Sequence, residues 1–143
     1  MSTIEDLADE IARMVGEFRD DYGGVAIDYG PPATVTLYLA RNLEHHARIL
    51  AGLFPTNRWR IVQVRHSLAY LKTVQAEISR DQLREAAEGA PIVSSVGIDV
   101  KSNVVTVSFV KRADNAAAEL ARRFGADLIS IRTLGTAPRP ARG

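Results

Sequence analysis

The chain contains two similar stretches about 70 residues apart, and this internal repeat constrains its fold more than any other feature. Residues 25–28 and 35–39 read Val-Ala-Ile-Asp and Val-Thr-Leu-Tyr-Leu. Residues 96–99 and 105–109 read Val-Gly-Ile-Asp and Val-Thr-Val-Ser-Phe. Because similarity at a fixed spacing indicates a repeated structural unit, we expect two copies of one fold.

Each copy carries the patterns of two helices and three strands in the order α-β-β-α-β. Alternating apolar residues predict the strands, and apolar residues three and four positions apart predict the helices. Ser2 or Thr3 is expected to cap the first helix, with Glu5 or Asp6 three residues later. In the first copy we expect a helical stripe over 4–18, strands over 25–29 and 34–40, a helix from Asn42 as its cap to Pro55, and a strand over 59–64. In the second copy we expect a helix from residue 68 that Ser79 and Gln82 restart or bend, strands over 95–100 and 104–110, a helix over 114–124 and a strand over 128–132.

This order predicts an α+β protein made of tandem duplicated α-β-β-α-β units, each a small three-stranded sheet with helices on one face. In each unit two strands form a hairpin, and a helical crossover adds the third strand. We expect the first unit to span residues 1–66, the second to span 67–135, and residues 136–143 to be a flexible tail. The uncovered face of each sheet is expected to be apolar and to need the sister unit, a second copy or another protein.

The composition excludes several functional classes. The 143 residues include no cysteine, so the chain has no disulfide, thiol nucleophile or thiolate metal site. A hydrophobic content of 46% without a long apolar run is typical of a globular protein that spans no membrane. The chain begins without the basic and apolar segments of a secretory signal, so we expect a cytoplasmic protein, secreted only if the chain is an excised fragment.

No residue pattern supports catalysis, a metal site or a cofactor. Asp28 and Asp99 end equivalent strands, where an aspartate favours turn formation over paired acid–base chemistry. His45 and His46 are neighbours on a helix, so their side chains diverge by about 100° and cannot share one metal ion. We expect both histidines to be solvated and no histidine to have an acidic partner.

RNA binding is the weaker alternative. The element order suggests a KH-like RNA module, but the glycine clamp loop of such modules is absent. Arg58, Arg60 and Arg65 lie around Trp59 and form the best candidate for nucleic-acid contact. The net charge of +1 and the carboxylates spread along the chain argue against it.

Two segments of the second copy resemble a known family. Residues 97–107 read Gly-Ile-Asp-Val-Lys-Ser-Asn-Val-Val-Thr-Val, and residues 120–127 read Leu-Ala-Arg-Arg-Phe-Gly-Ala-Asp. The first segment resembles the Val-Asp-x-x-x-Asn-x-Val-x-Val strand-turn-strand signature in the pro-regions of secreted actinobacterial chymotrypsin-type serine proteases, the streptogrisin and α-lytic protease group. The second is similar to the helix end and Tyr/Phe-Gly element that precede the last strand of that family. Residues 23–28 and 62–71 are similar to the first pro-subdomain and its exit, which extends the resemblance from about residue 18 to residue 134.

The resemblance implies a non-catalytic folding partner made of two small helix-on-sheet lobes. In that family the pro-region pairs its C-terminal sheet with a protease hairpin and sends its tail into the active-site cleft, as chaperone and inhibitor. Carried over to this chain, the last strand and the tail at 136–143 would bind the partner protein. The residues implied are Leu128, Ile129, Ser130 and Ile131 in the strand, and Arg139, Pro140 and Arg142 in the tail.

We therefore expect a protein that is not an enzyme and that acts in trans on a trypsin-like protease or a protease-like domain. Strand addition at the edge of the second sheet would be the mode of binding. The alternative is a self-associating structural or adaptor domain, in which the open sheet faces bury each other in a homodimer. Neither hypothesis involves a membrane, a cofactor or a metal.

Overall fold

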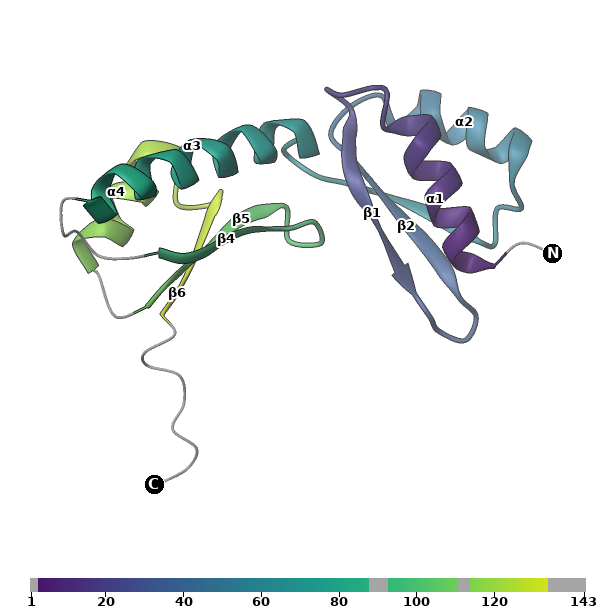
Figure 1. Cartoon of the computed structure of the whole chain (residues 1–143). Helices are drawn as coiled ribbons and strands as arrows, with labels where there is room; N and C mark the ends of the chain where they lie inside the picture. Colours follow the sequence, from purple (N-terminus) through teal and green to yellow (C-terminus); the bar gives the residue numbers. More distant parts are fainter. Residues whose placement is uncertain (1–2, 88–92, 111–113, 134–143) are drawn as a thin grey trace. The chain divides into compact units, whose positions relative to one another are not determined.

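The computed structural model describes residues 3–87, 93–110 and 114–133. Within these residues, four helices and two three-stranded sheets form two α-β-β-α-β repeats (Figure 1). The α+β class and the tandem duplication are thereby confirmed. Contacts divide the chain into two compact units. The second begins at Leu71, and the turn Val100–Asn103 belongs to the first.

The first repeat begins with a helix whose predicted capping box is present. It consists of α1 (Ile4–Val15), β1 (Tyr22–Asp28), β2 (Thr34–Leu39), α2 (Leu43–Leu53) and β3 (Trp59–Gln63). The Thr3 hydroxyl accepts the Asp6 N–H, and the Asp6 carboxylate accepts the Thr3 N–H. These bonds satisfy amides that lack a partner in the first turn of a helix. The helix ends at Val15 with Gly16 as its C-cap, so Phe18 lies outside it and is exposed.

The second repeat contains a longer first helix. It consists of α3 (Leu68–Ala87), β4 (Val93–Asp99), β5 (Val104–Phe109), α4 (Asp114–Phe124) and β6 (Ile129–Thr133). The expectation that Ser79 and Gln82 restart α3 is wrong, because the helix is continuous through both residues. Its buried stripe of Leu71, Val74 and Ile78 keeps the three- and four-residue spacing of a single helical face.

Both sheets place the second strand of the repeat at the centre. β1 pairs antiparallel with β2, and β3 pairs parallel with β2 on its other side. β4, β5 and β6 repeat the same arrangement. The register repeats as well, because Val35 lies opposite Trp59 and Val105 lies opposite Ile129. A parallel third strand requires a crossover, which α2 and α4 provide.

Each unit has its own hydrophobic core between its helices and one face of its sheet. Three alternate residues of each central strand are buried there: Val35, Leu37 and Leu39 in β2, and Val105, Val107 and Phe109 in β5. Leu50 of α2 and Leu120 of α4 complete the two cores from the crossover helices. The repeated spacing in the sequence is therefore the spacing of core positions.

The open face of the second sheet is polar, so the expectation of an apolar face was wrong there. Successive side chains of a strand point to opposite faces, which places the residues between the core positions on the open face. In the second sheet these residues are Ser95, Gly97, Asp99, Val104, Thr106, Ser108, Ser130 and Arg132. Hydroxyl side chains are compatible with water, and an antiparallel hairpin tolerates one solvated face. This face therefore does not require an apolar partner.

Several predicted features lie outside the described residues. They include the tail at 136–143 with Arg139, Pro140 and Arg142, and the helix end near Gly89 and Pro91. Within the described ranges, no helix combines the length and the hydropathy needed to cross a membrane.

Candidate functional site

The candidate site is the outer edge of β6, which contains most of the predicted pairing strand. β6 lies at one end of the order β4-β5-β6, and β5 is its only partner among the described residues. In Figure 1, β6 is the yellow strand of this sheet. An edge strand has one row of backbone N–H and C=O groups that the sheet itself does not use.

The hydrogen-bond pattern shows which residues of β6 face outward. The Val105 N–H donates to the Leu128 carbonyl over 2.9 Å, so the backbone of Leu128 faces β5. Since the backbone groups of successive residues alternate in direction, Ser130 also faces β5, whereas Ile129 and Ile131 face the outer edge. Of the four predicted strand residues, Leu128 and Ser130 hold β6 on the sheet, and only Ile129 and Ile131 offer backbone groups to a partner.

The side chains of β6 differ in exposure on its two faces. Ile129 is buried and Ile131 packs against the second core, as does Leu128 just before the strand. Ser130 is half-buried and Arg132 is exposed on the open face. A partner strand would therefore meet apolar side chains on the helix side and polar side chains on the other.

Two of the other sheet edges, β1 and β4, differ from β6 in regularity. The register of β1 shifts between Tyr22 and Gly24, and that of β4 shifts between Val93 and Ser95. Such bulges interrupt the ladder and protect an edge from pairing. β3 is the regular edge of the first sheet, and its Ile61 is the repeat equivalent of Ile131. β3 and β6 are thus the two edges in the described chain without a register shift.

One pair of buried polar residues was missed by the sequence analysis. His46 Nε2 lies 2.8 Å from Asp21 Oδ2, and the side chains are only 2% and 8% exposed. The expectations that His46 is solvated and that no histidine has an acidic partner are therefore wrong. The sequence holds a signal for the burial, because His46 lies three residues after Leu43 and four before Leu50, on the inward face of α2.

Asn42, which is exposed, also contacts the buried pair. It occupies the predicted N-cap position of α2 with φ at 57°, but its side chain forms no capping hydrogen bond, so only the position of the cap was predicted correctly. Its Nδ2 instead donates to both carboxylate oxygens of Asp21, over 3.3 and 3.2 Å. Burial alone would raise the pKa of Asp21, but the hydrogen bonds from His46 and Asn42 outweigh it and hold the pKa below its ordinary value.

This cluster is a structural one. The ring centroids of Phe18 and His45, two exposed side chains, lie 4.9 and 5.1 Å from that of His46, and the His46 ring itself is buried. A histidine and aspartate that act in catalysis need an accessible nucleophile beside the ring. Asp28 is also structural, since its carboxylate accepts the Gly30 N–H in a turn, as predicted. Within the described ranges, no group of three metal-ligating side chains occurs.

Two of the residues proposed for RNA contact, Trp59 and Arg60, are engaged within the first unit. Trp59 packs against the first core, and its Nε1 donates to the Phe54 carbonyl over 3.3 Å. Arg60 Nε donates to the Thr36 hydroxyl over 3.0 Å on the open face of the sheet. A tryptophan packed in this way offers little ring surface for base stacking.

The cavity between α3 and α4 has a volume of about 400 Å³ and is lined by charges that pair with one another. Arg123 Nη1 lies 2.6 Å from Asp81, and its Nη2 lies 3.3 Å from Glu77. Glu119, which also lines the cavity, pairs with Arg122. These contacts tie the two helices together and make the cavity a weaker candidate than the β6 edge.

Comparison with known protein families gives one match. Residues 66–127 match the family model of the alpha-lytic protease prodomain, and this confirms the resemblance inferred from the sequence over those residues. The match contains α3, β4, β5 and α4 and ends just before β6. A search of curated proteins found no match.

Proposed function

We propose that this chain, whose residues 66–127 match the alpha-lytic protease prodomain, is a non-catalytic protein-binding module that acts in trans on a chymotrypsin-type serine protease or a protein with such a domain. Its action would be that of a folding chaperone or an inhibitor. The single observation that carries the mode of binding is the regular outer edge of β6, where Ile129 and Ile131 offer backbone groups to an added strand.

Three features support strand addition at this edge. β6 has no register shift, and the described part of it contains no proline. Ile129 and Ile131 anchor the strand in the core, so the edge is held in an extended conformation before a partner arrives. A preformed edge lowers the ordering cost of binding. The tail at 136–143, with Arg139, Pro140 and Arg142, follows this strand and would enter the active-site cleft.

The test is inhibition of purified alpha-lytic protease by the full-length chain and by variants of single edge residues. Ile131→Pro removes an outward N–H while leaving the bonds between β6 and β5 intact, because those use the backbone of Ser130. Ile131→Ala keeps the N–H and removes more of the packed side chain. We expect the proline variant to weaken inhibition at least tenfold and the alanine variant to change it less than threefold.

The repeat supplies a second control. Ile61→Pro makes the same change at the equivalent position of β3 and should leave inhibition unaltered. Equal losses of inhibition from Ile61→Pro and Ile131→Pro would show that β6 is not the specific binding edge. Absence of inhibition by the wild-type chain would contradict the proposal. Deletion of residues 136–143 should weaken inhibition with an unchanged circular dichroism spectrum. Unchanged inhibition would exclude the tail from the mechanism.

The alternative function is self-association as a structural or adaptor domain. The second sheet does not favour a face-to-face dimer, because the open face of this sheet carries hydroxyl side chains. An edge-to-edge dimer through β6 remains compatible with the same exposed backbone. Light scattering of the wild-type chain distinguishes the two functions, since a dimer that Ile131→Pro dissociates would occupy the edge that the protease needs.

A further inference from the structure

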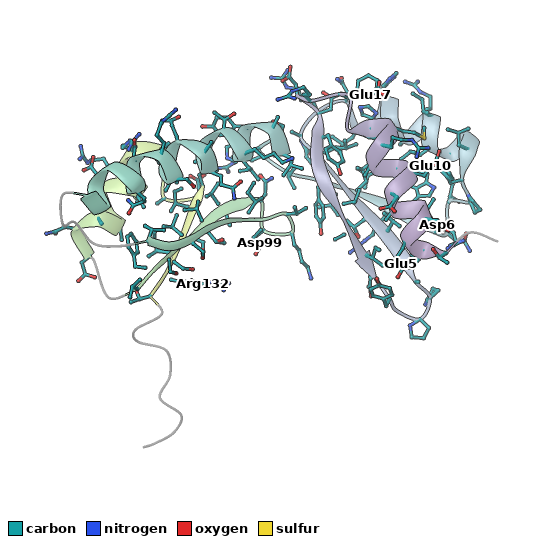
Figure 2. All side chains as sticks on the ribbon, viewed as in Figure 1. Glu5, Asp6, Glu10, Glu17, Asp99 and Arg132 are labelled. Atoms are coloured by element: carbon teal, nitrogen blue, oxygen red, sulfur yellow. The ribbon has the colours of Figure 1, made fainter. Side chains whose placement is uncertain are left out.

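Arg132 is the charged side chain next to the outer edge of β6. Arg132, labelled in Figure 2, is exposed. The register of β6 places it on the open face of the second sheet, on the same side as Ser130. No ion pair or hydrogen bond of its guanidinium occurs within the described residues. A cation at this place is therefore available to a strand that adds to β6.

Among the described residues of this face, Asp99 carries the carboxylate, and it lies too far away to neutralise Arg132. Asp99 lies on β4 opposite Val104, whereas Arg132 lies opposite Ser108, two strands across and four residues along (Figure 2). Strand spacings of 4.8 Å and a rise of 3.3 Å per residue put their Cα atoms about 16 Å apart. Thr106, Ser108 and Ser130 occupy the face between them and carry no charge.

The first sheet also has an arginine at its edge, but that arginine is hydrogen-bonded within the sheet. Arg60 of β3 also lies on an open face at a sheet edge, but its Nε donates to Thr36 of the central strand. The residue equivalent to Arg60 in the second repeat is Ser130, and the residue equivalent to Arg132 in the first is Val62. Among the described residues, an arginine without a partner at a sheet edge is therefore particular to β6 and is not a consequence of the repeated fold.

We propose that Arg132 selects the partner strand, which carries a carboxylate on the open face opposite Arg132 and apolar side chains on the face that adjoins Ile129 and Ile131. This inference rests on strand addition at β6. Side chains directly opposite each other on neighbouring strands interact, and opposite charges favour the pair. A guanidinium and a carboxylate also form charge-assisted hydrogen bonds. The partner is thus an extended segment with alternating apolar and polar residues and an acidic residue among the polar ones.

The test uses the full-length chain and three blocked nine-residue peptides of alternating valine and threonine that differ only in a central Glu, Gln or Lys. Binding is followed by fluorescence anisotropy. We expect the Glu peptide to bind about three- to tenfold more tightly than the Lys peptide, with the Gln peptide between them. Added salt should reduce this difference, because it screens exposed charges.

Two charge-reversal variants make the assignment specific. Arg132→Glu should reverse the order of the peptides, whereas Arg80→Glu makes the same charge change on the exposed surface of α3 and should preserve it. A Glu preference that survives Arg132→Glu would overturn the inference, as would equal binding of the three peptides. Absence of binding by every peptide would also overturn it, while the protease inhibition assay decides the proposed function separately.

Discussion

His46 and Asp21 form a buried hydrogen-bonded pair in the first unit, with His46 Nε2 lying 2.8 Å from Asp21 Oδ2. Asp21 directly precedes β1, and His46 lies on the second turn of α2. The backbone carbonyl of Asp21 also accepts the Ala40 N–H over 2.7 Å. One aspartate therefore joins the start of β1, the end of β2 and the crossover helix.

We expect His46→Ala to destabilise the first unit by about 3 kcal/mol, because it leaves a buried carboxylate without one of its partners. The neighbouring substitution His45→Ala is the matched control, since His45 is exposed, and it should change stability by less than about 0.5 kcal/mol. Urea unfolding followed by the fluorescence of Trp59, the single tryptophan of the chain, reports on this unit. Similar losses of stability in both variants would contradict a specific role for the hydrogen bond between His46 and Asp21.

The pair also predicts a dependence of stability on acid pH. The folded-state pKa of Asp21 lies below its ordinary value, which is about 3.9 in an unfolded chain. The folded protein thus binds fewer protons than the unfolded chain between these two values. The stabilisation from the carboxylate is complete above the ordinary value and is lost as the pH falls through the folded-state value.

Asp21→Asn removes this titration with little change of shape. We expect the stability difference between wild type and Asp21→Asn, measured by urea unfolding, to be constant at pH 5–6 and to shrink as the pH falls below about 4. A difference that stays constant down to pH 2.5 would show that the carboxylate contributes nothing through its ionisation.

The fold was largely predictable from the sequence, because the spacing of apolar residues indicates each helix and strand locally and the same spacing occurs in both repeats. Core positions such as Leu37 and Val107 recur at the same register in both repeats, so each copy supports the assignment of the other. The parallel third strand also follows from the helical crossover before it. The role of His46 was harder to predict, because its acidic partner lies 25 residues away and the pairing depends on how β1 and α2 pack.

The candidate site was only partly predictable for a similar reason. The sequence predicts a strand near 128–132, but the direction of each backbone group depends on the register between β5 and β6. This register assigns Leu128 and Ser130 to the sheet and Ile129 and Ile131 to the edge. The apolar open face was predicted from the small size of the sheet, whereas alternation along the strands places Ser and Thr side chains there.

The capping box of α1 predicts a moderate effect on stability. Thr3→Ala removes the hydroxyl that accepts the Asp6 N–H and should destabilise the first unit by about 1 kcal/mol. Thr3→Ser keeps the hydroxyl and should retain most of the wild-type stability. Unfolding followed by Trp59 fluorescence checks both variants. An alanine variant as stable as the serine variant would show that the exposed cap has no energetic role.

Asn103 lies in the turn between β4 and β5 and is held there by its backbone conformation and its side chain. Its φ of 59° lies in the left-handed region, which asparagine tolerates better than most residues. Its side chain is buried, with Oδ1 accepting the His66 N–H and Nδ2 donating to the His66 carbonyl, both over 2.8 Å. A single side chain thus satisfies both backbone groups of a residue in the segment after β3.

Two substitutions separate the two contributions of Asn103. Asn103→Gly keeps the backbone conformation and removes both hydrogen bonds, so we expect a loss of about 2 kcal/mol. Asn103→Ala adds left-handed strain and should cost about 1 kcal/mol more. Hydrogen exchange of the His66 amide should become faster in both variants, whereas the amide of Ser67 provides a neighbouring reference. If the His66 amide kept its wild-type protection from exchange in Asn103→Gly, the hydrogen bonds of the Asn103 side chain would not be what stabilises the backbone at His66.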